Sequence, residues 1–272
     1  MPPVGELIWF AAALAGAGVV AGVLAGLFGI GGGAILVPVF YQVFGLLQVD
    51  DAVRMHLSVG TSLAIIVPTS LRSFMAHKKR GAVDLALLKS WILPVPRGVM
   101  AASLIAASVS SSALRAIFAL IAILVGLRML FNKAHWRLGS DLPANPVRAA
   151  VGAVIGLLSA LMGIGGGVLN NTFMTLYGRP VHQAVATSSG VGVLISIPGL
   201  FGYLWAGWGE AALPPFSTGY VNWVAVALII PITLLVAPLG VRLAHALDKR
   251  QLEIGFGLFM LFVAARFFYS LI

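Results

Sequence analysis

The stretch Gly29-Ile30-Gly31-Gly32-Gly33 occurs a second time in the chain, as Gly163-Ile164-Gly165-Gly166-Gly167, and both copies lie in strongly apolar segments. Each glycine costs a helix about 1 kcal/mol relative to alanine, so three in succession predict a break in each segment. At membrane depth a break is tolerated only where the backbone is buried in protein or lines a polar cavity. Two breaks at matching positions in two halves of a chain are typical of the substrate site of a transporter.

The composition indicates that these segments lie in a membrane. The chain has 272 residues, of which 60% are hydrophobic and 9% are charged, and its mean hydropathy is +1.03. A soluble domain has roughly 25% charged residues. There is no cysteine, so disulfides and thiolate metal sites are excluded. The apolar segments contain no paired carboxylates, histidine-rich cluster or phosphate-binding loop, so we predict neither an enzyme nor a cofactor.

Apolar runs of about 20 residues predict membrane-spanning helices. We expect ten apolar segments, at residues 5–28, 34–45, 53–75, 83–107 and 113–131, and then at 147–164, 168–178, 182–206, 220–245 and 251–271. Segment 34–45 is too short to cross a core of about 30 Å at 1.5 Å per residue. With the glycine break before it, this segment is typical of a half-helix in a re-entrant hairpin, and segment 168–178 is its counterpart.

The two halves resemble each other in sequence. His56 precedes Thr61-Ser62 by five residues, and His182 precedes Thr187-Ser188 by the same interval. Small residues recur four apart before each triplet, where they predict close helix packing; they are Gly18, Gly22 and Gly26, and Gly152, Gly156 and Ala160. We therefore predict a first repeat at 1–131, a linker at 132–146 and a second repeat at 147–272, within one integral membrane domain.

The net charge of +9 is arranged in clusters that indicate topology rather than binding of nucleic acid. The clusters are His77 to Arg80, the linker with Lys133, Arg137 and Arg148, and Lys249-Arg250. Cytoplasmic loops are enriched in lysine and arginine, so these clusters are expected to be cytoplasmic and both termini periplasmic. Counting segments gives the two halves opposite orientations. The predicted fold is an all-α polytopic membrane protein of two inverted-topology repeats, each with a glycine-broken helical hairpin and three transmembrane helices.

The predicted substrate site lies at the two breaks. The N-termini of half-helices present free N–H groups and partial positive charge, which suit anions. The candidate substrate-binding residues are Gly31, Gly32, Gly33, Thr61, Ser62, Gly165, Gly166, Gly167, Asn170, Asn171, Thr187 and Ser188. The glycines could also serve close packing, and the hydroxyls could bond carbonyls of their own helices.

Three further side chains are candidates because of their charge. Arg97 falls near the middle of its expected segment, where a charge is expensive and where a guanidinium would attract an anion. Alternatively, it is an arginine that extends from a kinked helix towards the interface. His56 and His182 lie at the starts of their segments and could relay protons, or could simply be residues of the interface.

The glycine-triplet segments, the Thr-Ser helices and the arginine-ended last segments resemble the sulfite exporter TauE/SafE family, also called TSUP. The resemblance covers nearly the whole chain. It implies a carrier in the bacterial inner membrane for a sulfur-containing anion such as sulfite, a sulfonate such as sulfoacetate, or thiosulfate. Arg97 is not part of the family pattern, and the resemblance implies no enzymatic activity.

Several alternatives stay open from the sequence. The break residues could line an anion channel instead of a carrier site, or the carrier could transport an organic anion without sulfur. The coupling ion, either proton or sodium, the direction of transport, the oligomeric state and whether the hairpins span or dip are not specified by the sequence.

Overall fold

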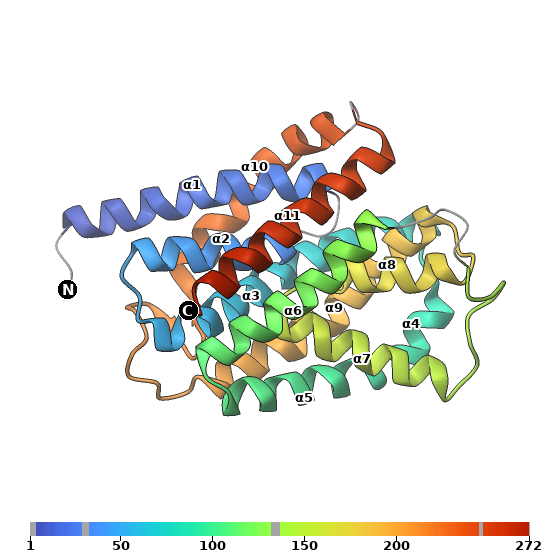
Figure 1. Cartoon of the computed structure of the whole chain (residues 1–272), viewed down its shortest axis with the longest axis horizontal. Helices are drawn as coiled ribbons and strands as arrows, with labels where there is room; N and C mark the ends of the chain where they lie inside the picture. The colour runs from blue at the N-terminus through green and yellow to red at the C-terminus, as the bar shows by residue number, and fades with distance from the viewer. Residues whose placement is uncertain (1–3, 29–32, 132–136, 245–246, 272) are drawn as a thin grey trace.

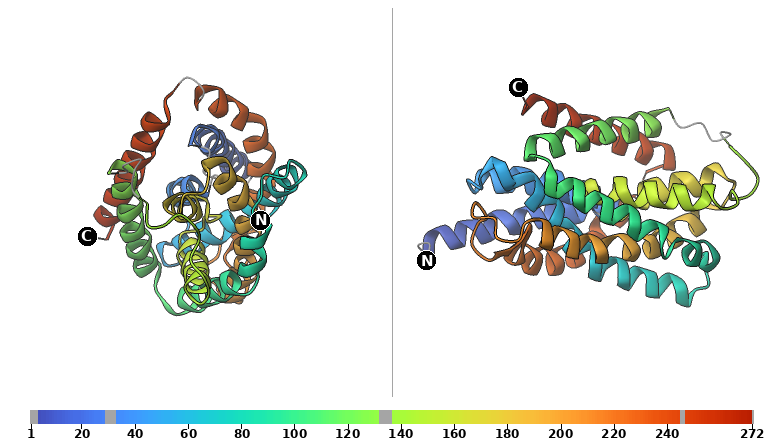
Figure 2. Two further views of the ribbon diagram at one scale, coloured as in Figure 1. Left: turned by 90° about the vertical axis from the view of Figure 1, so that its right-hand side faces the viewer. Right: turned by 90° about the horizontal axis from the view of Figure 1, so that it is seen from below.

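The structure is a computed structural model, and it describes residues 4–28, 33–131, 137–244 and 247–271. These residues form a helical bundle with one short hairpin of strands (Figures 1 and 2). The helices of the first half are α1 (Val4–Phe28), α2 (Gly33–Leu46), α3 (Asp51–Lys79), α4 (Leu85–Trp91), α5 (Pro94–Ser108) and α6 (Ser111–Leu130). Those of the second half are α7 (Val147–Leu161), α8 (Gly167–Leu176), α9 (Val181–Ala206), α10 (Trp223–Ala244) and α11 (Lys249–Tyr269).

Five of the described helices are long and apolar enough to cross a membrane, and the number rises to six if α4 and α5 count as one bent span. The five are α3, α6, α9, α10 and α11. Apolar helices of this number and length are those of a multi-pass membrane protein. The short helices expected after the glycine breaks are confirmed as α2 and α8.

The apolar segment expected at 83–107 is helical but bent. The chain leaves α4 at Trp91 and resumes in α5 at Pro94, with a bend of 46° between the two helices. Proline removes a backbone donor and disfavours helical geometry in the residue before it, so Pro94 and Pro96 account for the break. Trp91, at the bend, contacts α7 of the second half: its indole N–H donates to the Arg148 carbonyl at 2.9 Å.

Helices of one half pack mainly on helices of the other. Helix α1 packs along α10, α5 along α7, α6 along α11 and α3 along α9. The start of α3 lies beside the segment that follows α9, and the start of α9 lies beside the segment that follows α3. Helices α3 and α9 are therefore antiparallel neighbours.

The expected close packing at the small-residue positions is confirmed at two crossings. A Cβ atom added to Gly156 of α7 would lie 2.3 Å from the Val95 carbonyl oxygen of α5. One added to Gly22 of α1 would lie 2.5 Å from a methyl carbon of Val236 in α10. Gly26 lies next to residues outside the described part of the chain. Glycine at these positions lets the helix backbones approach closely.

Both termini lie at one end of the bundle, and the ends of α3, α6 and α10 lie at the other (Figure 1). The basic residues His77 to Arg80, Arg137, Arg148 and Arg250 belong to that second end. At the end with the termini, β1 (Ser217–Thr218) and β2 (Val221–Asn222) pair antiparallel before α10.

A buried ion pair fastens four helices at the end with the termini. Arg115 of α6 is 5% exposed and its Nη2 lies 2.8 Å from Oδ2 of Asp51, the first residue of α3. Arg115 also donates to the Tyr41 hydroxyl of α2 and to the Ser270 hydroxyl that follows α11. Tyr41 donates to the other Asp51 oxygen at 2.9 Å, and Arg54 lies 3.3 Å from that oxygen.

Candidate functional site

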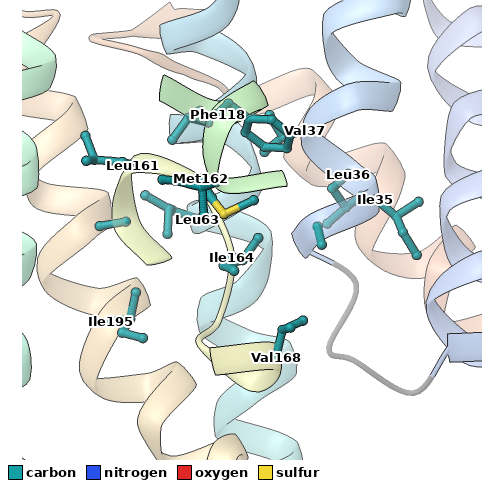
Figure 3. Packing of buried hydrophobic residues seen from close by; sticks show 14 of the residues in the cluster. Ile35, Leu36, Val37, Leu63, Phe118, Leu161, Met162, Ile164, Val168 and Ile195 are labelled. Atoms are coloured by element: carbon teal, nitrogen blue, oxygen red, sulfur yellow. The ribbon is translucent and has the colours of Figure 1, made fainter. Parts of the chain in front are cut away.

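The start of α2 packs against the glycine break of the second half. A Cβ atom on Gly33 would lie 2.7 Å from the Ile164 Cα and 2.8 Å from the Gly163 carbonyl oxygen, so only glycine fits there. Ile66 of α3 lies against both Gly33 and Gly165. Figure 3 shows the two parts together, with Ile35 and Leu36 on α2 beside Ile164 and Val168. The predicted residues Gly31 and Gly32 lie outside the described residues.

The second break is built from glycines in left-handed conformations. Helix α7 ends at Leu161, Gly163 has φ of 63° and Gly166 has φ of 71° as the N-cap of α8. Side chains are strained at such angles, which explains the glycines. Among the described residues, no carbonyl accepts from the N–H groups of 165–169. Gly165 and Gly167 stay partly exposed, and a helix N-terminus of this kind can bind a small anion.

The predicted amide and hydroxyl residues of the second half form one hydrogen-bonded chain. Asn170 donates through Nδ2 to the Ser188 hydroxyl at 2.7 Å, and Ser188 donates to Asn171 Oδ1 at 2.6 Å. This chain joins α8 to α9 and leaves Asn171 partly exposed. The corresponding residues of α2 are the buried Leu36 and Val37, so the first half offers an apolar wall instead (Figure 3).

Ser62 contacts the break directly. Its hydroxyl is fully buried and donates to the Gly163 carbonyl at 2.8 Å, from α3 of the other half. The bond pairs a carbonyl that the broken helix leaves free, which is required where no water is present. Ser62 therefore supports the backbone of the break.

The two predicted threonines have partners away from the break. Thr61 accepts from the Asn222 backbone N–H at 3.1 Å, and Thr187 accepts from the Asp84 N–H at 2.9 Å. Asn222 and Asp84 are themselves helix caps, since their side chains accept from the N–H groups of Ala225 and Leu87. Each threonine thus holds the start of a helix that belongs to the other half.

Replacing Thr61 with valine is expected to lower the free energy of unfolding by about 1–3 kcal/mol, because the buried Asn222 N–H loses its acceptor. The same change at Thr187 is expected to cost less, since Asp84 is partly exposed. Thermal unfolding in detergent measures both effects. Thr69→Val is the matched control, because its hydroxyl bonds only carbonyls of its own helix. A Thr61 variant that keeps its stability but loses anion binding would contradict this structural role and would indicate that Thr61 binds the substrate.

Arg97 lies apart from this cluster. Arg97 is in the first turn of α5, directly after the bend in the segment, and its side chain is exposed. The neighbouring Gly98 faces α7 instead, where a Cβ atom would lie 1.9 Å from the Ala153 carbonyl oxygen. The site proposed below therefore does not include Arg97.

The two predicted histidines differ in environment. His56 is 2% exposed, its Nε2 lies 3.0 Å from the Ala106 carbonyl oxygen, and its ring stacks on Tyr220 at 4.7 Å. Burial, and after it the Glu210 carboxylate, raise the pKa of Tyr220, so the phenol next to His56 stays neutral. His182 is exposed at the start of α9. A proton relay through these residues stays a prediction.

Sequence reasoning missed three groups. Asp84 and Asn222 cap α4 and α10, and they stand one step before apolar helices, which is a usual signal of an N-cap. Arg115 is a charged residue close to the start of an apolar segment, and this position was a signal in the sequence that it needs a partner. Ser159 has no distinguishing sequence signal, because a lone serine in an apolar helix is common. Its side chain lies beside the break.

The chain was compared with known proteins. The model of the family described as sulfite exporter TauE/SafE matches residues 14–267. A probable membrane transporter protein of Haemophilus influenzae is 30% identical over 92% of this chain and 95% of its own length. Probable membrane transporter proteins of Methanocaldococcus jannaschii and Bacillus subtilis are 29% and 28% identical, over 87% and 86% of this chain and 87% of each relative. No solved structure matches. The helices, the paired breaks and this match together place the chain in the sulfite exporter TauE/SafE family.

Proposed function

We propose that this chain is a secondary transporter that moves a small sulfur-containing anion across the membrane by alternating access. The N-terminus of α8 supports this proposal most strongly. Its free N–H groups lie at a break between membrane helices, beside the start of α2 and the amide and hydroxyl groups of Asn170, Asn171 and Ser188. Uncharged donors of this kind bind an anion without holding it too tightly to release.

The proposed architecture is a pair of inverted repeats, at 1–131 and 147–272, joined by the linker 132–146. The helix pairs favour it, because the first helix of each half packs on the fourth apolar segment of the other half. Helix α1 packs on α10, and α7 packs on α5, which forms the fourth segment of the first half together with α4. The threonine contacts repeat in the same crossed way. Such a pair of units can rock around a shared site, which gives alternating access.

The substrate class is proposed from the family and from the chemistry of the site. Sulfite, thiosulfate and organosulfonates such as sulfoacetate each present several oxygen acceptors to the N–H groups of one helix end. We place the protein in the bacterial inner membrane with both termini periplasmic and the linker cytoplasmic, because the basic clusters with His77 to Arg80, Arg137, Arg148 and Arg250 share one end of the bundle. Protons or sodium ions are the proposed coupling ions, and no catalytic step or cofactor is proposed.

Flux into proteoliposomes tests the function. Vesicles that contain the purified protein are given sulfite, thiosulfate, sulfoacetate, sulfate or acetate, with and without a proton or sodium gradient. Saturable flux of a sulfur anion at carrier rates is expected. Flux at channel rates without saturation would favour an anion channel, and selective flux of acetate would favour a carrier of non-sulfur anions.

Replacing Gly166 with alanine is expected to weaken anion binding about 10-fold or more. The new methyl group would stand at the N-cap of α8, 2.6 Å from a methyl carbon of Ile195, and would disturb the amides that hold the anion. The anion concentration needed for a given rise in melting temperature measures the effect, because stabilisation by a ligand grows with the logarithm of its concentration relative to its Kd.

Gly178→Ala is the matched control for this variant. Gly178 has φ of 77°, close to the 71° of Gly166, but it follows the other end of α8 and its nearest neighbours are 3.6 Å away. Both variants therefore introduce similar backbone strain. Equal loss of binding in the two would attribute the effect to strain and would argue against a site at the start of α8.

A further inference from the structure

We infer that only the second of the two repeats binds the anion. One anion binds per chain, at the N-terminus of α8, and the Ser159 hydroxyl donates a hydrogen bond to it. This inference rests on the proposed function and assigns a ligand residue and a stoichiometry to that site. The buried, unpaired side chain of Ser159 beside the break is the observation that supports it.

Ser159 stands in the last turn of α7, immediately before the break. Its side chain is fully buried, and its Oγ lies 3.6 Å from the position of a Cβ atom on Gly166, the N-cap of α8. The Ser159 carbonyl accepts from the Ile164 N–H at 2.9 Å, which fixes the position of the serine relative to the break. The hydroxyl is therefore held next to the free N–H groups of α8.

The hydroxyl of Ser159 has no hydrogen-bond partner among the described residues. Most serines in helices bond a carbonyl of the preceding turn, as Ser103 does with Val99 at 3.0 Å. A buried polar group without a partner costs stability, so such groups are rare and require an explanation. A donor that is kept free beside a helix N-terminus is explained if an anion supplies the acceptor.

The first half lacks the equivalent chemistry. When the two glycine triplets are aligned, Ser159 corresponds to Ala25, and Asn170 and Asn171 correspond to Leu36 and Val37. Around the second break, the chain therefore has polar side chains at positions where the first half has apolar ones.

Thermal stabilisation and titration calorimetry of the purified full chain test this inference, with sodium sulfite, thiosulfate and sulfoacetate as probes at matched ionic strength. Ser159→Ala is compared with Ser103→Ala, which removes a buried hydroxyl that already has a partner. We expect about one anion per chain in the wild type. We expect affinity about 10-fold lower in Ser159→Ala, the usual scale for a hydrogen bond to a charged group, and unchanged affinity in Ser103→Ala.

A second readout separates a ligand role from a structural one. Without anion, Ser159→Ala should melt at the wild-type temperature or above it, because the change removes an unpaired buried hydroxyl. Two anions per chain, wild-type affinity in Ser159→Ala, or a lower melting temperature of that variant without anion would each overturn the inference and leave the proposed function standing. If none of the three anions binds the wild type, both the proposed function and this inference fail.

Discussion

Replacing Gly98 with alanine is expected to prevent assembly of the bundle or to destabilise it by about 3 kcal/mol or more. The Cβ atom would lie 1.9 Å from the Ala153 carbonyl oxygen and 2.9 Å from the Leu157 nitrogen, both backbone atoms of α7. No rotation of a side chain relieves such an overlap, so α5 and α7 would have to separate along their crossing. The contact is reciprocal, because a Cβ atom on Gly156 of α7 would lie 2.3 Å from the Val95 carbonyl oxygen.

Size-exclusion profiles and thermal unfolding of the detergent-solubilised protein measure this effect. Gly16→Ala of α1 is the matched control, since no atom lies within 4 Å of its Cβ position and alanine favours a helix by about 1 kcal/mol. The control should therefore be as stable as the wild type or more so. A Gly98 variant with the wild-type profile would mean that α5 and α7 are further apart than described above.

The second large effect is expected at the ion pair of Asp51 and Arg115, and it should be unequal for the two partners. Asp51→Ala leaves the guanidinium of Arg115 without a counter-charge at 5% exposure, which should cost about 3 kcal/mol or more. Arg115→Met should cost about 1 kcal/mol, because the Asp51 side chain is 51% exposed and still faces Arg54.

Thermal unfolding of both single variants and of the double variant forms the test. The double variant should be no less stable than Asp51→Ala alone, since the buried charge is removed together with its partner. Equal costs for the two single changes would indicate that solvent reaches Arg115. Strictly additive costs would show that the two residues do not interact.

The amino-acid pattern predicted the parts of the fold that depend on hydrophobicity and on glycine. The long apolar segments became helices within a few residues of their expected bounds, although segment 83–107 is divided between α4 and α5, and the short segments after the triplets became α2 and α8. These outcomes follow from local chemistry, because chain length across a membrane and the helix propensity of glycine need no tertiary information.

The site was harder to predict because hydroxyl positions repeated in two halves have two explanations. A duplicated substrate site and a duplicated structural contact give the same sequence pattern at Thr61 and Thr187. The hydrogen bonds that these threonines accept from the Asn222 and Asp84 N–H groups become visible only in three dimensions. Arg97 illustrates a second reason. The direction of its side chain depended on the bend at Pro94, and the structure leaves that side chain exposed in the first turn of α5.

The packing of α1 on α10 has a consequence for how this protein is made. The glycines of α1 fit against Ile232 and Val236, residues that the ribosome adds long after α1 itself. Until then, α1 presents its small-residue face to lipid, because its main partner does not yet exist. A chain that stalls before α10 therefore keeps this face exposed, and a membrane protease or insertion chaperone could use it to distinguish unfinished chains from complete ones.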